Sequence, residues 1–146
     1  MSERTESEIE IAATPAVIMS VIADLAMYPQ WCPGVKSCEV LATFPDGRPK
    51  DVEMVFDSGP IQDTHQYRYD SWSDREVRWH LISGKTVTGL WGVYACQVVD
   101  QDMTRVTYRL AMDLAVPIIG ALKRRAERAI VGAALRGLKA RVEAQG

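Results

Sequence analysis

The chain has 146 residues, of which 47% are hydrophobic and 25% are charged. These values lie close to globular averages and exclude a disordered, collagen-like or low-complexity protein. The net charge of −2 argues against a nucleic-acid-binding protein, because such proteins carry a large positive excess that displaces counterions from phosphates. We therefore expect one domain over residues 1–146, with its core from about residue 7 to about residue 143.

The cysteines and the first residues predict a cytoplasmic protein without metal or cofactor. Cys32, Cys38 and Cys96 are odd in number and lack a Cys-x-x-Cys spacing, so neither a disulfide framework nor a zinc site is expected. The N-terminal segment is acidic where a secretory signal is basic. No apolar run approaches the roughly 20 residues that cross a bilayer, and no phosphate-binding or nucleophile-elbow motif occurs.

The first predicted elements are a strand and two short helical segments. Residues Glu8–Ile11 alternate between charged and apolar side chains, which is typical of a strand. Thr14 and Pro15 then form an N-cap and a first-turn proline for a helix. Tyr28-Pro29 is expected to end this helix, and a second short turn is expected over residues 30–34.

Six strand-like runs, separated by turn residues, follow from Val35 to Asp113. Connections this short join antiparallel neighbours, because parallel strands need crossovers of a dozen residues or more. The pattern therefore predicts an antiparallel meander.

Pairing across the predicted turns places Trp79 opposite Leu90, Cys96 opposite Tyr108, and Tyr67 beside Trp79. In this register one face of the sheet is apolar and aromatic, whereas Arg68 and other charged residues face water. The predicted inner face consists of Val52, Met54, Phe56, His65, Tyr67, Tyr69, Val77, Trp79, Leu81, Leu90, Tyr94, Tyr108 and Leu110.

After Pro117 the hydrophobic period becomes helical up to about Glu143, which predicts one helix of about 26 residues. Small residues opposite large aromatic ones either let the helix and the sheet approach closely, or leave a space that an apolar ligand fills. The small residues expected to face the sheet are Ala126, Ala129, Ala133 and Gly137.

This order of elements is the helix-grip arrangement of an α+β protein, in which a seven-stranded antiparallel sheet wraps around the last helix and two short helices follow the first strand. The residues that narrow it further are Tyr28-Pro29-x-Trp31-x-Pro33-x-Val35, Val77-x-Trp79-x-Leu81, Leu90-x-Gly92-x-Tyr94 and Thr104-Arg105-Val106-Thr107-Tyr108. With them the chain resembles the polyketide cyclase/dehydrase family of the START-related, birch-pollen-allergen-like (SRPBCC) superfamily. The resemblance implies a hydrophobic cavity between sheet and helix, which takes lipids, sterols, quinones or polyketides in different members and usually holds no cofactor.

The leading functional hypothesis is binding or transport of a hydrophobic small molecule, such as a lipid, a quinone or a polyketide-like compound, in that cavity. Buried tyrosine hydroxyls need hydrogen-bond partners, and either a ligand oxygen or other protein groups would supply them. The residues expected to line or gate the cavity are Trp31, Met54, Phe56, Tyr67, Trp79, Leu90, Tyr94, Tyr108, Leu122 and Ile130.

The alternative is an enzyme, a polyketide aromatase/cyclase or dehydrase, in which His65 and Tyr67 or Tyr108 transfer protons. Such an enzyme also polarises a substrate carbonyl, and Arg68 is the candidate for that role even though the register turns it outward. A single histidine on a sheet is also typical of a core residue with satisfied hydrogen bonds. Asp63 is interpreted as a turn or surface residue without a functional role.

Two surface features predict partners. Trp91 faces outward in the predicted register, so either a homodimer covers it or the register is wrong and Trp91 lies inside. A basic cluster near the start of the last helix would contact anionic lipid head groups, or else is solvated. A ligand-free interaction module using these surfaces is the third functional hypothesis. The basic cluster consists of Lys123, Arg124, Arg125 and Arg128.

Overall fold

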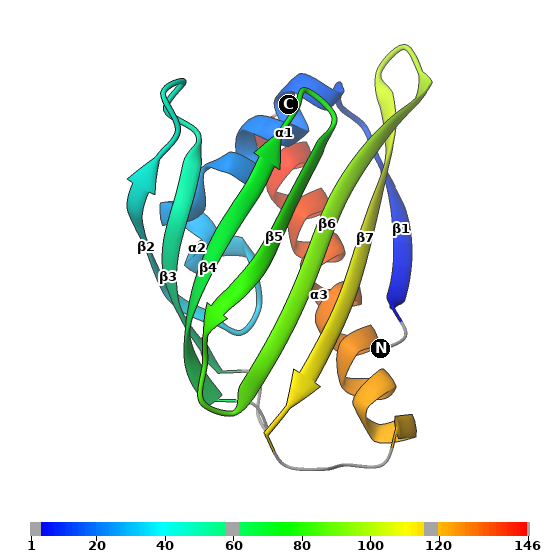
Figure 1. The fold of residues 1–146 in the computed structure, drawn as a ribbon. Helices are drawn as coiled ribbons and strands as arrows, with labels where there is room; N and C mark the ends of the chain where they lie inside the picture. Colours follow the sequence, from blue (N-terminus) through cyan, green and yellow to red (C-terminus); the bar gives the residue numbers. More distant parts are fainter. Residues whose placement is uncertain (1–3, 58–61, 116–119, 146) are drawn as a thin grey trace.

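The computed structural model describes residues 4–57, 62–115 and 120–145. In chain order the elements are β1 (Thr5–Ile11), α1 (Pro15–Ala23), the 3-10 turn η1 (Leu25–Met27), α2 (Tyr28–Trp31), β2 (Val35–Thr43), β3 (Pro49–Asp57), β4 (Gln62–Trp72), β5 (Glu76–Ser83), β6 (Val87–Asp100), β7 (Met103–Leu114) and α3 (Gly120–Gln145). Figure 1 shows the sheet as one curved layer, with α3 along its concave side and α1 and α2 near one end of that helix.

The described strands form one seven-stranded sheet in the order β1-β7-β6-β5-β4-β3-β2, and every neighbouring pair is antiparallel. Strands β2 to β7 are a meander, and β1 closes the other edge against β7. The predicted α+β helix-grip fold, with short helices after the first strand and a long helix at the end, is confirmed.

The strand register differs from the predicted one by two residues at each of three hairpins. Trp79 lies opposite Gly92 rather than Leu90, Cys96 lies opposite Val106, and Tyr69 rather than Tyr67 lies opposite Trp79. Because side chains alternate with a period of two, this error leaves every residue on its predicted face. The predicted inner face is accordingly buried, apart from Leu81, which is partly buried against the core.

Tyr28-Pro29 begins the short helix α2 instead of ending the preceding one, which already ends at Ala23. The proline occupies the first turn of α2, where its missing N–H leaves no intrahelical bond unmade. The Tyr28 hydroxyl donates a 2.5 Å hydrogen bond to the Ile22 carbonyl and so attaches α2 to α1.

The prediction of which residues of α3 face the sheet is only partly confirmed: Ala126 packs against the core, whereas Gly137 approaches the Trp31 carbonyl oxygen of α2. Ala129 is exposed, and Leu122 at 50% exposure lies on the outside of the helix. Larger apolar residues take the buried side because α3 packs along β1 and β7 as well as against α1 and α2. The buried residues of α3 are Glu127, Val131, Ala134, Leu135, Leu138 and Val142. Pro117, the predicted start of the helix, lies outside the described residues.

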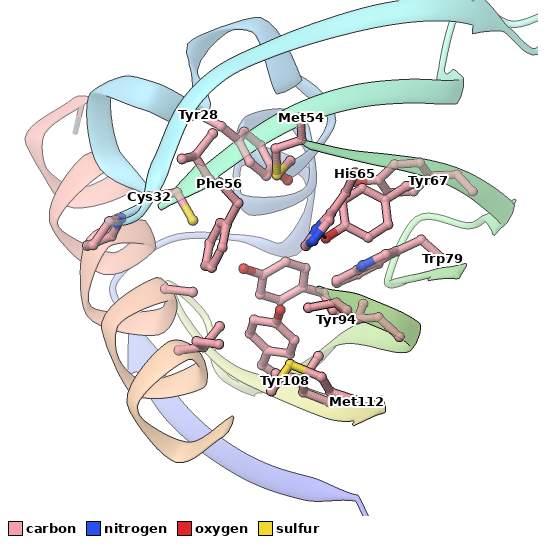
Figure 2. Close-up of a pocket in the computed structure, with 18 residues that line it drawn as sticks. Tyr28, Cys32, Met54, Phe56, His65, Tyr67, Trp79, Tyr94, Tyr108 and Met112 are labelled. Carbon is pink, nitrogen blue, oxygen red and sulfur yellow. Dashed lines mark hydrogen bonds between the residues drawn. The ribbon is translucent and has the colours of Figure 1, made fainter. Parts of the chain in front are cut away.

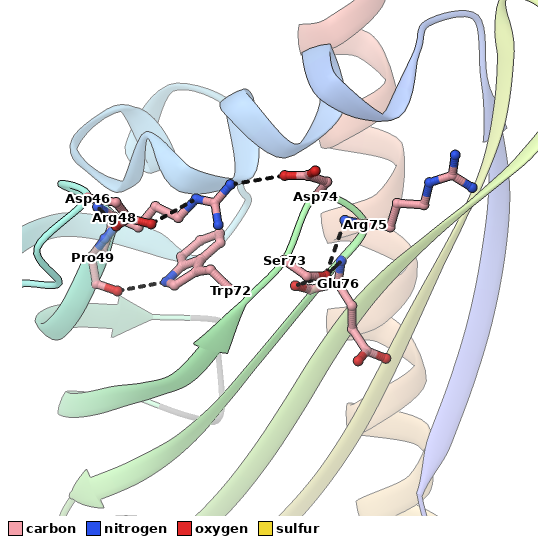
Figure 3. A network of polar contacts seen from close by, with 8 residues as sticks. All are labelled: Asp46, Arg48, Pro49, Trp72, Ser73, Asp74, Arg75 and Glu76. Carbon is pink, nitrogen blue, oxygen red and sulfur yellow. Dashed lines mark hydrogen bonds and ion pairs between the residues drawn. The ribbon is translucent and has the colours of Figure 1, made fainter.

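A polar network joins the β2–β3 and β4–β5 turns at one end of the sheet (Figure 3). The Trp72 indole N–H donates a 2.7 Å hydrogen bond to the Pro49 carbonyl, and Arg48 pairs with Asp74 at 3.4 Å. The Ser73 hydroxyl oxygen accepts the Glu76 N–H at 3.0 Å. These contacts join the two turns at the end of the sheet that lies near α1.

The outer face of the sheet carries ion pairs and one large exposed aromatic residue. Arg105 pairs with Glu10, and Arg109 pairs with Glu6 across β7 and β1. Trp91 is 52% exposed and lies opposite His80, so the alternative that places it inside the molecule is excluded. Within the described residues, none of the helices has the length and apolar character that crossing a membrane requires.

Candidate functional site

A pocket lies between the inner face of the sheet and α3, with the α2 segment on one side (Figure 2). Its volume is about 60 Å³, whereas pockets for drug-sized ligands measure about 300–1,000 Å³. The rings of Tyr94, Tyr108 and Trp79 pack against one another at tilted angles, with centroids 4.6–5.7 Å apart, and occupy space between the sheet and α3. A wide open cavity, as expected from the small residues of the last helix, is therefore not what the structure holds.

Most of the residues predicted to line the cavity surround this pocket: Met54, Phe56, Tyr67, Trp79, Leu90, Tyr94, Tyr108 and Ile130. Two of the predicted residues, Trp31 and Leu122, are not among those that line it. Trp31 is buried but borders a separate surface hollow near Arg141, because α2 directs its indole toward the α1–α3 side. Leu122 lies on the exposed side of α3, a turn or more from the pocket-lining Ile130 and Ala134.

Three tyrosine hydroxyls at the pocket, those of Tyr69, Tyr94 and Tyr108, form no hydrogen bond with the described residues. Tyr94 and Tyr108 also contact one another, with ring centroids 4.6 Å apart. Burial raises the pKa of both phenols well above the ordinary value of 10, so both remain protonated at neutral pH. Each hydroxyl is therefore available to donate a hydrogen bond to a ligand oxygen.

Three side chains on β4 form a chain of polar contacts that ends at the pocket. The Tyr67 hydroxyl lies 2.5 Å from His65 Nδ1, and Asp63 Oδ2 lies 3.3 Å from His65 Nε2. His65 and Asp63 lie within ion-pair distance, but the geometry of their contact does not meet that of a hydrogen bond. Figure 2 shows the His65 ring nitrogen meeting the Tyr67 oxygen beside the pocket.

Asp63 was not predicted as part of a site, because a residue beside a turn is typically a turn former or a surface charge. It is held by the β5–β6 turn: Asp63 Oδ2 accepts the N–H groups of Lys85 at 2.8 Å, Thr86 at 2.7 Å and Val87 at 3.1 Å. The signal that reveals it is the spacing Asp63-x-His65-x-Tyr67, since residues i, i+2 and i+4 of a strand share one face.

The pKa shifts fix the protonation states of this chain of contacts. Burial would raise the pKa of Asp63, but the hydrogen bonds from Val87, Lys85 and Thr86 outweigh burial and lower it. Burial also lowers the pKa of His65, and the opposing attraction of Asp63 does not reverse that shift. Asp63 is thus an anion and His65 is neutral at pH 7, so Tyr67 donates its O–H to Nδ1.

Burial of the neutral His65 side chain predicts an acid-dependent loss of stability. Below the ordinary pKa of 6.5 the unfolded chain takes up a proton that the folded protein does not, so stability falls as the pH drops toward the lowered folded-state pKa. The free energy of unfolding should fall by up to about 1.4 kcal/mol per pH unit in this window. Urea titrations between pH 7 and pH 5 measure the slope. His65→Gln should flatten it and His80→Gln should retain it; an unchanged slope in His65→Gln contradicts the assignment.

Arg68 and Cys32 do not supply reactive groups to the pocket. Arg68 points outward, as the register predicts, and its Nε lies 2.9 Å from Asp51 Oδ1. Cys32 lines the pocket, but burial raises the pKa of its thiol to about 12, which keeps it protonated. Over the described ranges, no three or more His, Cys, Asp or Glu side chains come together in a way that could hold a metal ion.

The fold and the pocket can be compared with those of known proteins. Residues 2–143 match the family described as polyketide cyclase / dehydrase and lipid transport. A START superfamily protein from Mycobacterium smegmatis is 22% identical, with a TM-score of 0.92 over 98% of this chain and 99% of that chain. The Zhui aromatase/cyclase from Streptomyces sp. R1128 is 16% identical, with a TM-score of 0.82 over 99% and 96% of the two chains.

A protein from Thermus thermophilus is 23% identical, with a TM-score of 0.83 over 99% of both chains. None of the curated proteins matches this chain by sequence. At these identities the structural likenesses establish the shared fold.

Proposed function

Because the chain belongs to the polyketide cyclase / dehydrase and lipid transport family, we propose that it binds a hydrophobic small molecule between α3 and the inner face of the sheet. The observation that carries the proposal is that tyrosine hydroxyls in an otherwise aromatic and aliphatic pocket, among them those of Tyr94 and Tyr108, form no hydrogen bond with the described residues. Apolar walls with a few directed polar groups are typical of small-molecule sites. The favoured ligand therefore has an apolar ring or chain and at least one oxygen acceptor.

A ligand larger than the 60 Å³ cavity needs side chains to move. Met54 and Met112 line the pocket, and their unbranched, flexible side chains repack at low cost. Cys32 and Pro33, which follow α2, lie on the pocket wall and form the mouth in this proposal. Binding thus widens the pocket at its methionines, while the rings of Tyr94 and Tyr108, which pack against each other, keep their positions.

A titration with 2-tetralone, a bicyclic hydrophobic ketone, tests the proposal. In ¹H–¹³C spectra of methionine methyl groups, the signals of Met54 and Met112 should shift, and that of Met103 at the start of β7 should not. Ala134 is 3% exposed and lines the pocket, so Ala134→Leu should weaken binding at least tenfold by filling the space. Ala129→Leu, on the exposed side of α3, is the matched control and should bind like the wild type.

Thermal unfolding of both variants shows whether each is folded. Equal affinity in Ala134→Leu and Ala129→Leu, or shifts confined to methionines outside the pocket, would contradict binding at this site. Absence of any shift favours the ligand-free interaction module.

A second candidate function is a polyketide aromatase/cyclase or dehydrase. The hydrogen bond between Tyr67 and His65 at the pocket wall favours it, because a cyclase or a dehydrase needs a proton-transfer group beside its substrate. The outward ion pair of Arg68 with Asp51 counts against it, since Arg68 is then no carbonyl clamp. The carrier function remains the leading proposal.

Three further predictions belong to this proposal. The free thiols of Cys32, Cys38 and Cys96 accord with a cytoplasmic protein. Membrane contact through the basic cluster would deliver a lipid-derived ligand, and exposed members such as Arg125 and Arg128 are placed for it. A homodimer would cover Trp91 on the outer face of the sheet.

A further inference from the structure

We infer that Asp63, His65 and Tyr67 form an acid–base relay that exchanges a proton with the carbon atom next to the carbonyl group of a bound hydrophobic ketone. The inference rests on the proposed binding function, since the ketone has to occupy the pocket. It goes beyond that function because it assigns a reaction, enolisation, and a new member of the site, Asp63.

Tyr67 is the group that touches the substrate. Its side chain is 6% exposed and lines the pocket, and its O–H is directed to His65 Nδ1 at 2.5 Å. Because that proton is committed to His65, the lone pairs of the Tyr67 oxygen are left to accept a proton from a ligand atom. Burial keeps the pKa of Tyr67 well above 10, so the resting group is a neutral phenol rather than a phenolate.

His65 stores the proton, and Asp63 balances the resulting charge. His65 is 1% exposed, and a lone imidazolium there would be costly to bury. Asp63 Oδ2, 3.3 Å from Nε2, supplies the opposite charge, and the three turn N–H groups plus the Thr64 N–H at Oδ1 hold the carboxylate in place. Asp63 is therefore a positioning residue that acts through His65.

Tyr94 and Tyr108, which share the inner face of the sheet with Tyr67, accommodate the negative charge that develops on the carbonyl oxygen. The neutral hydroxyls of Tyr94 and Tyr108 have no partner among the described residues, so either one can donate to the oxygen of a developing enolate. The Tyr108 ring contacts those of Tyr94 and Trp79, which fixes its position. The pocket thus offers a proton acceptor and an oxyanion donor to one bound molecule.

The step balances without any further reagent. The carbon–hydrogen bond beside the carbonyl breaks, its proton bonds to the Tyr67 oxygen, and the Tyr67 proton moves to His65 Nδ1. The electron pair of the broken bond forms the enolate double bond, and the negative charge rests on the carbonyl oxygen, next to Tyr94 or Tyr108. Reversal returns a proton to carbon, so in D₂O the relay replaces hydrogen by deuterium at that carbon.

The test follows deuterium exchange at C1 of 2-tetralone in D₂O by ¹H NMR, with binding measured in parallel from the Met54 and Met112 methyl signals. The wild type should exchange C1 protons faster than buffer alone. Tyr67→Phe and His65→Gln should slow the protein-dependent exchange by about 100-fold or more, with the dissociation constant within threefold of the wild type. His80→Gln, on the outer face beside Asp70, should exchange at the wild-type rate.

Asp63→Asn separates a positioning role from a merely structural one. It should lower the maximal exchange rate about tenfold while the half-saturating 2-tetralone concentration stays within threefold. A change confined to the half-saturating concentration overturns the role of Asp63.

The outcomes distinguish the two proposals. If 2-tetralone binds but exchanges no faster than in buffer, or if Tyr67→Phe exchanges at the wild-type rate, the relay is wrong and the binding function stands. If 2-tetralone shifts neither pocket methionine, the binding function fails, and the relay fails with it.

Discussion

Replacing Gly92 with alanine is expected to destabilise the protein by about 3 kcal/mol, the upper end of the usual cost of overpacking. A β-carbon at Gly92 would lie 2.2 Å from Cζ2 and 2.3 Å from Cε2 of Trp79, on the opposite strand. The indole ring is rigid and packs against the rings of Tyr94 and Tyr108, so it has to shift into the pocket. Thermal unfolding should show a melting temperature lower by about 6–12 °C, and the affinity for 2-tetralone should fall.

Gly89→Ala on the same strand is the matched control. The atoms nearest to its β-carbon belong to the exposed Trp91 ring, at 3.0 Å, and to the Asp113 carboxylate, at 3.1 Å. The ends of surface side chains can move at low cost, so the loss of stability in Gly89→Ala should stay below about 1 kcal/mol. Equal losses of stability in the two variants would show that Gly92 is needed for the conformation of the strand backbone rather than for the space that the Trp79 ring occupies.

Gly137→Ala is expected to destabilise the protein by about 2 kcal/mol. Its β-carbon would lie 2.0 Å from the Trp31 carbonyl oxygen, so α3 contacts the backbone of α2 directly at this point. Overpacking against a backbone atom costs about 3 kcal/mol, and the better helix propensity of alanine recovers about 1 kcal/mol. Because α2 leads into the pocket wall at Cys32 and Pro33, the variant should also weaken ligand binding.

Gly132→Ala, in the same helix, isolates the contribution of the helix propensity of alanine to stability. The nearest atom to its β-carbon is the end of the Arg136 side chain at 3.1 Å, which can move. The free energy of unfolding of this variant should rise by up to about 1 kcal/mol. Urea unfolding compares the two variants, and a Gly137→Ala protein as stable as Gly132→Ala would refute the close approach of α3 and α2.

The faces of the strands could be predicted from the sequence because side chains alternate with a period of two, so a register error of two residues leaves each side chain on its face. The register was wrong by two residues at each of the three hairpins for which it was predicted, yet His65, Tyr67 and Trp79 still face inward. The positions of the turns were harder to predict. The β5–β6 turn is fixed by the carboxylate of Asp63, more than twenty residues earlier in the chain, and no local pattern reveals such a contact.

The buried face of α3 was not predictable from small residues alone, because alanines occur on several sides of this helix. The burial of Val131, Leu135 and Leu138 follows from packing against β1 and β7 at an edge of the sheet, which is a property of the tertiary structure. The aromatic residues on the inner face could be predicted, but the size of the pocket could not, since it depends on how the rings of Tyr94, Tyr108 and Trp79 pack against one another.

Native mass spectrometry of the protein, purified gently from its own source, tests the central claim most directly. The binding proposal predicts a mass above that of the polypeptide, which falls to the polypeptide mass on denaturation as a hydrophobic, oxygen-containing compound is released. Ala134→Leu should carry much less of this compound than Ala129→Leu. A native mass of the wild-type protein equal to that of the polypeptide alone would contradict the proposal. So would an Ala134→Leu variant that carries as much of the bound compound as the wild type.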